Sequence, residues 1–176
     1  MKTIIISMLF CVTYLHAQTN YYTTTKTFYE SGYTYQCDVR VSGFIALYKS
    51  NTWNNIYPVY KNTGETFAQT DEGVELLEND TWTRSKRFSI VNEAFSTSEK
   101  QRVKGHDFDI IMYINSTTGT VDEVNFEFYK STPYTTIPIS TFRKIETEIK
   151  KNIWYTPTAE GKELSYIYYW WAQEPK

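Results

Sequence analysis

The stretch HDFDIIMYINSTTGTVDEVNFEFYK, residues 106–130, contains two runs that each have the composition of a β-strand. They are separated by STTG, whose Gly119 can take the positive φ that a tight hairpin turn needs. In the second run Val124, Phe126 and Phe128 alternate with acidic and amide side chains, so only one face of this strand is expected to be dry. The stretch therefore predicts an antiparallel hairpin.

A helix is expected after the hairpin, in ISTFRKIETEIKKN, residues 139–152. Its apolar stripe consists of Phe142, Ile145, Ile149 and Ile153. Glu146 and Lys150 stand four residues apart on the side expected to be polar, where such a pair adds a few tenths of a kcal/mol. This helix is predicted to pack on one face of the sheet.

The final strand is expected around SYIYYWW, residues 165–171, after a turn at Gly161. Alternation places Tyr166, Tyr168 and Trp170 on one face and Ile167, Tyr169 and Trp171 on the other. Because both faces are apolar or aromatic, the strand is predicted to lie in the middle of the sheet. In the alternative interpretation, Tyr169 and Trp171 form an exposed platform that binds sugar or peptide.

Earlier segments predict further strands. Residues 33–41 alternate with strand period and place Cys37 inward, as a small core residue rather than a reactive thiol. Strands are also expected at 42–49 and 55–61, and Pro58 moves the latter toward an edge because proline cannot donate to a ladder. A short strand is predicted at 74–78.

Two short helices are expected in the centre of the chain. The first runs from about residue 83 to 95 and buries Phe88, Val91 and Phe95. Three basic residues of this helix are expected to face solvent: Arg84, Lys86 and Arg87. Ser96 and Glu99 match a capping box that opens a second helix, which stops at Gly105.

Together these elements predict an α+β protein with a mainly antiparallel sheet. It consists of an N-terminal β-meander, two short central helices and a C-terminal β-β-α-β unit. No repeat or proline-rich linker divides the chain, so residues 18–176 are expected to form one domain, with a β-rich half at 18–80 and a second half at 81–176.

Residues 1–17 have the layout of a secretory signal peptide, with a lysine, an apolar run and Ala17 ahead of a polar residue. Cys11 follows a large Phe10, which disfavours a lipid-anchored cysteine. No other apolar run reaches the length of a membrane span. The remaining 159 residues carry 17 basic and 20 acidic side chains, and without a basic cluster they give no support for nucleic-acid binding.

Few residues could carry catalysis. After cleavage the chain holds one cysteine and one histidine, so neither an internal disulfide nor a cysteine/histidine metal cluster is expected. A serine or cysteine hydrolase would need His106 as its base, but His106 is expected to be an ordinary boundary histidine, and Asp107 points to the other side of the strand. No phosphate loop or cofactor motif occurs. Two carboxylates could still hydrolyse a glycan.

Residues 106–171 also resemble the C-terminal domain of TonB-type proteins. The resemblance rests on INSTTGTV in the hairpin, a helix, WYTP, a GK turn and a long final strand. The chain lacks the proline-rich spacer of a TonB transducer and has a cleavable signal in place of a retained membrane helix, so an energy-transducing role is not implied. With NYYTTTKTFYESGYTYQC near its start, the whole chain is similar to small secreted proteins of unknown function from gut-dwelling Gram-negative bacteria.

Two functions therefore remain open. The favoured one is a non-enzymatic binding module of the periplasm or cell surface, which recognises a protein, peptide or glycan. The alternative is a small hydrolase of cell-wall or dietary glycan that uses an Asp/Glu pair. A close carboxylate pair with one raised pKa would favour the enzyme, and an exposed aromatic strip would favour the module. The sequence leaves the ligand and the oligomeric state undetermined.

Overall fold

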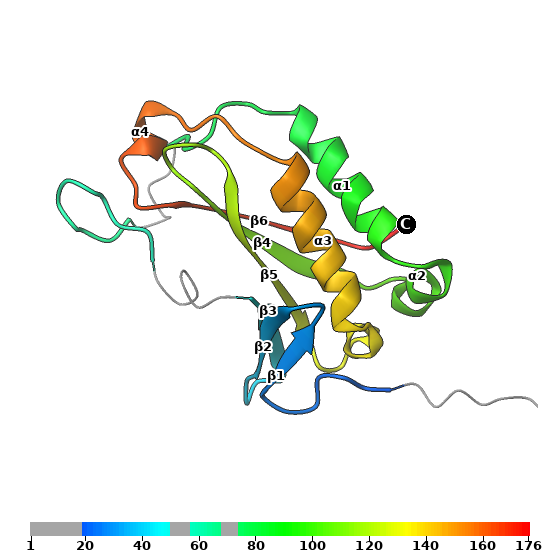
Figure 1. Ribbon diagram of the computed structural model, residues 1–176. Helices are drawn as coiled ribbons and strands as arrows, with labels where there is room; N and C mark the ends of the chain where they lie inside the picture. The colour runs from blue at the N-terminus through cyan, green and yellow to red at the C-terminus, as the bar shows by residue number, and fades with distance from the viewer. Residues whose placement is uncertain (1–18, 50–56, 68–73) are drawn as a thin grey trace, which may run out of the picture.

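The computed structural model describes residues 19–49, 57–67 and 74–176. In this part of the chain, six strands form one antiparallel sheet in the order β1-β2-β3-β5-β4-β6 (Figure 1). The strands are β1 Lys26–Glu30, β2 Tyr33–Val39, β3 Phe44–Tyr48, β4 Phe108–Ile114, β5 Val121–Tyr129 and β6 Ile167–Gln173.

The helices lie between the strands in the sequence. They are α1 Trp82–Ala94, α2 Thr97–Val103, α3 Ile139–Asn152 and the short α4 Ala159–Lys162, with a 3-10 turn at Pro133–Thr136. Helices α1 and α3 run beside each other across one face of the sheet (Figure 1). The α+β class, the N-terminal meander, the two central helices and the C-terminal β-β-α-β order are all confirmed.

The helix α3 packs through the stripe predicted for it. Phe142, Ile145 and Ile149 are fully buried, and Ile153 is nearly so. The ring of Phe142 stacks on that of Phe128 in β5 at 5.6 Å between centroids. Burying each such side chain is worth about 1.5–3 kcal/mol, so this stripe holds α3 on the sheet.

The β4–β5 hairpin also forms as predicted. Gly119 has a φ of +75° and donates from its N–H to the carbonyl of Asn115 at 2.8 Å. A Cβ at this position would collide with the carbonyl oxygen of Tyr155, whose own N–H donates to Gly119. Glycine is therefore required here both for its backbone conformation and for close approach of the next segment.

The capping box that opens α2 is confirmed. The Ser96 hydroxyl accepts a hydrogen bond from the backbone N–H of Glu99, and the Glu99 carboxylate accepts one from the backbone N–H of Ser96. Each bond satisfies a donor that the first turn of a helix leaves free. Gly105 follows the helix with a φ of +82°.

The position predicted for the last strand is wrong. β6 pairs with β4 alone and lies at the end of the described strand order, beyond β4. Two apolar faces favour a central strand only when both faces are covered. In β6 one side is covered by α1, whereas Trp170 on the other side is 54% exposed.

Other strand predictions differ in detail. β1 was not expected, because its sequence KTFYE is short and half polar. In place of a strand at 55–61, the described residues 57–61 form isolated bridges that join Val59 to Thr66 and Tyr60 to Leu164. At 74–78 only Leu77 forms a bridge. Residues 55–56 and the predicted signal peptide at 1–17 lie outside the described residues.

Candidate functional site

The two faces of the sheet carry different side chains. The face under α1 and α3, which we call the helix face, is the main apolar core. The opposite face, which we call the distal face, carries acidic, amide and aromatic side chains. It includes Gln36, Asp38, Phe44, Ala46, Tyr48, Asp109, Ile111, Tyr113, Glu123, Asn125, Glu127, Tyr129, Tyr168, Trp170 and Ala172.

Tyr169 and Trp171 point to the helix face and form no exposed platform, so this alternative from the sequence is corrected. Trp171 is 8% exposed and lies under α1. The Arg87 guanidinium from α1 lies 4.7 Å from the Tyr169 ring centroid and 4.5 Å from that of Trp171. The strand alternation therefore directs the neighbouring residues, Tyr168 and Trp170, to the distal face.

Arg87 was expected in solvent but is 3% exposed, which is a second correction. Its Nη2 donates to the Tyr169 hydroxyl at 3.1 Å. The aromatic rings on which it lies attract a guanidinium through their quadrupoles, so a cation can be buried here. Among the described residues, its Nε and Nη1 have no hydrogen-bond partner.

Aromatic side chains gather at the β6 end of the distal face. Ile111, Tyr113 and Tyr166 form a small apolar cluster, and Tyr168 packs against it. The Tyr113 ring centroid lies 5.9 Å from that of Tyr168. Trp170, opposite Ile111, remains more than half exposed.

Three carboxylates lie in one row across the distal face. The strand register pairs Asp38 with Ala46, Ala46 with Glu127, Glu127 with Asp109, and Asp109 with Ala172. Residues directly opposite on antiparallel strands have Cβ atoms about 4.5–5.5 Å apart, so the Glu127 and Asp109 side chains are immediate neighbours. In the same row, Ala46 lies next to Glu127 and Ala172 lies next to Asp109.

The carboxylates of Asp109 and Glu127 have no direct partner among the described residues, although the charge of Arg40 acts on Glu127. Within the described residues, neither accepts a hydrogen bond or forms an ion pair, whereas Asp38 accepts from the Tyr48 hydroxyl at 2.5 Å. Burial, and then the charge of Asp107, raises the pKa of Asp109.

The pKa of Glu127 is raised as well. Burial raises it most, the charge of Arg40 lowers it, and the charge of Asp109 raises it. Like charges placed directly opposite each other on two strands are destabilising. The Asp109–Glu127 pair is thus electrostatically unfavourable in the isolated protein.

The amide of Asn125 belongs to the same surface. It is 2% exposed and lies on β5 between Glu123 and Glu127. Its nitrogen donates to the Tyr113 hydroxyl at 3.3 Å, whereas its oxygen has no donor among the described residues. A buried carbonyl oxygen without a donor costs about 1–3 kcal/mol.

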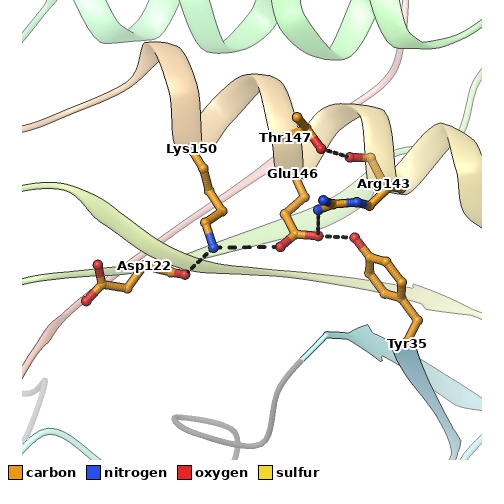
Figure 2. Close-up of polar contacts among 6 residues, drawn as sticks. All are labelled: Tyr35, Asp122, Arg143, Glu146, Thr147 and Lys150. Atoms are coloured by element: carbon orange, nitrogen blue, oxygen red, sulfur yellow. Dashed lines mark hydrogen bonds and ion pairs between the residues drawn. The ribbon is translucent and has the colours of Figure 1, made fainter. Parts of the chain in front are cut away.

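A second polar cluster lies under α3 (Figure 2). Glu146 is fully buried, which corrects its predicted place on the polar side of the helix. It accepts hydrogen bonds from the Tyr35 hydroxyl and from Arg143 at 2.9 Å, and Lys150 lies 3.9 Å away. Burial and the Glu146 charge raise the pKa of Tyr35 above its usual range. With no exposed surface on Glu146, this cluster joins α3 to β2 and does not present a carboxylate to a substrate.

The remaining candidates from the sequence do not form a site. Cys37 is fully buried and burial raises its pKa to about 12, so it is a core thiol as predicted. His106 is exposed between α2 and β4, and its carbonyl accepts from the Tyr134 hydroxyl at 2.7 Å. Among the described residues, no group of three or more His, Cys, Asp or Glu could hold a metal ion. No described helix combines the length and hydropathy that crossing a bilayer requires.

The fold and this surface define an α+β domain whose antiparallel sheet has helices on one side and an acidic, aromatic face on the other. The chain belongs to the DUF5043 family, a domain of unknown function, whose profile matches residues 18–171. It is similar to a DUF5043 family protein from Bacteroides uniformis ATCC 8492 known from a crystal structure. The two chains are 36% identical, with a TM-score of 0.83 over 89% of this chain and 95% of that one. The comparison with curated proteins gives no match. The resemblance to TonB-type proteins is not confirmed by these comparisons.

The sequence does not give the Asp109–Glu127 pairing by itself. Turn geometry fixes the register of a hairpin, but Asp109 lies 7 residues before the predicted STTG turn and Glu127 lies 8 residues after it. A register shift between Tyr113 and Ile114 makes up this one-residue difference, and strand alternation does not reveal it. The pairing of Asp38 with this row could not be found either, because β3 joins β5 across a long connection.

Proposed function

We propose that this protein is a non-enzymatic binding module, exported to the periplasm or cell surface, whose distal face binds its ligand. One observation supports this most: exposed Trp170 and half-buried Tyr168 stand beside two carboxylates that have no hydrogen-bond or ion-pair partner in the described part of the chain. Aromatic rings supply contact area at low cost in conformational entropy, and nearby polar groups supply specificity.

The proposal is tested by binding to immobilised peptides, cell-wall glycans and dietary glycans. Trp170→Ala should abolish or strongly weaken any binding that the wild-type protein shows, because it removes the exposed indole ring nearest the carboxylate pair. Trp82→Ala is the matched control, since Trp82 is 41% exposed at the start of α1 and belongs to the other side of the molecule. Binding that survives Trp170→Ala and is lost in Trp82→Ala would reject the distal face as the ligand site.

A second candidate function is the hydrolysis of a glycan by Asp109 and Glu127. The observation in its favour is the direct pairing of two carboxylates with raised pKa values. Retaining glycosidases place two carboxyl groups about 5–5.5 Å apart. Such enzymes need environments that push the two pKa values apart, so that one group is the acid and the other is ionised.

Both pKa values are raised in this protein, and burial is the main cause for each, which favours binding over hydrolysis. If the protein is a glycan hydrolase, it should release reducing ends from cell-wall or dietary glycans. That activity should be lost in Asp109→Asn and in Glu127→Gln. Binding without any release of reducing ends is the result expected from a module.

A further inference from the structure

We infer that the ligand of the distal face is a cationic peptide segment, with a lysine or arginine side chain placed over Asp109 and Glu127. The inference rests on the proposed function and identifies the chemistry of its partner. It follows from the charges, from the neighbouring rings and from an amide oxygen that lacks a donor.

The first step concerns charge. Two neighbouring half-buried carboxylates without a donor among the described residues repel each other, and the charge of Arg40 offsets this only in part, since the pKa of Glu127 is still raised. A ligand that covers the pair removes more of its water. A neutral ligand would leave this repulsion in place. A cation between the two carboxylates replaces the repulsion with attraction and supplies several N–H donors, and a guanidinium can donate to both groups at once.

The second step concerns the surface beside the pair. Tyr168 lies near enough that the charges of Glu127 and Asp109, after burial, raise its pKa. Trp170 is two residues from Ala172, which faces Asp109 across the strands. Lysine and arginine pack their aliphatic stems on apolar rings while the charged end reaches an acid, and the cation is itself attracted to the ring face.

The third step concerns the Asn125 oxygen. Among the described residues it is a buried acceptor without a donor, and it lies on the strand that carries Glu127, one position along the same face. Its partial negative charge adds to that of the neighbouring carboxylates and favours a cationic ligand over an anionic one. Aromatic contact area, a carboxylate pair and a free amide acceptor together match a basic peptide, and the described residues supply too few ligands for a metal site.

The experiment compares three synthetic peptides of equal length, one basic, one neutral and one acidic, by calorimetric titration of the purified protein. The basic peptide is expected to bind, with an affinity that falls as salt is raised. The double variant Asp109→Asn, Glu127→Gln keeps the shapes of both side chains and is expected to bind it at least about tenfold more weakly. A double variant Glu160→Gln, Glu163→Gln removes the same charge from exposed residues at α4 and should bind as the wild type does.

Each other outcome has a distinct meaning. Basic-peptide binding that is equal in the two double variants overturns the inference. Binding of the neutral peptide or of a glycan that depends on Trp170 but not on the carboxylates overturns it and leaves the proposed function intact. If the binding of no ligand depends on Trp170, both the inference and the proposed function fail.

If Ca²⁺ raises the melting temperature of the wild type and not that of Asp109→Asn, Glu127→Gln, the pair binds a metal and the inference is wrong. A melting temperature of that double variant at or above the wild-type value shows that it is folded.

Discussion

Trp170 and Trp171 are adjacent in β6 and point to opposite faces, which allows one substitution to be compared on both sides of the sheet. Trp171 is 8% exposed and Trp170 is 54% exposed, so the second ring buries about half the area of the first. Replacing a buried tryptophan with alanine costs about 3–5 kcal/mol. Trp171→Ala should therefore lower the free energy of unfolding by about 3–5 kcal/mol, and Trp170→Ala by about 1.5–2.5 kcal/mol.

The upper end of the range is expected for Trp171→Ala because its ring also supports Arg87. Without the ring, a guanidinium that is 3% exposed loses one of its two aromatic neighbours, and the Trp171 Nε1–H no longer donates to Gln173. Urea unfolding followed by far-ultraviolet circular dichroism measures both variants without depending on tryptophan fluorescence. Equal losses, or a larger loss for Trp170→Ala, would refute the assignment of the two faces.

Two further predictions use the hairpin and the carboxylate pair. Gly119→Ala should destabilise far more than Gly105→Ala: both glycines have positive φ, but only at 119 would a Cβ collide with the backbone of Tyr155, and equal melting temperatures would contradict this. The raised pKa values of Asp109 and Glu127 mean that the folded protein holds these protons more tightly than the unfolded chain, so their part of the stability is present below about pH 4 and is lost as the pH rises through the raised values. Between about pH 4 and about pH 7, the free energy of unfolding measured with urea should fall in the wild type relative to Asp109→Asn, Glu127→Gln, and an identical pH dependence of the two proteins would contradict the shifts.

Much of the fold could be predicted because its strongest patterns are local. The α3 stripe has unbroken helical spacing, and the β4–β5 hairpin combines strand alternation with a glycine turn. Both patterns fix which side chains are buried without reference to the rest of the chain. The strand order could not be found in the same way, since β6 has apolar residues on both faces and still lies beyond β4 at the end of the described sheet.

The buried charged residues under the helices could not be predicted, because the sequence pattern alone places charged side chains in solvent. Arg87 is buried by aromatic rings contributed from β6, and Glu146 by Tyr35 from β2 and by Arg143. Partners this distant in the sequence cannot be recognised from helical periodicity. The same holds for β6. Alternation shows that Tyr168 and Tyr169 lie on opposite faces, but which face is covered depends on where α1 packs, and the sequence pattern does not show this.

The most direct test of the distal face as the ligand site is the indole N–H spectrum of the protein labelled with ¹⁵N. The chain has five tryptophans, and substitution assigns their signals one by one. On titration with the basic peptide, the Trp170 signal should shift. The signals of Trp171, which lies under α1, and of Trp82 should stay in place. The ring centroid of Trp82 lies 4.6 Å from that of Trp154. Shifts of the Trp82 and Trp154 signals with an unchanged Trp170 signal would place the ligand elsewhere and contradict the account.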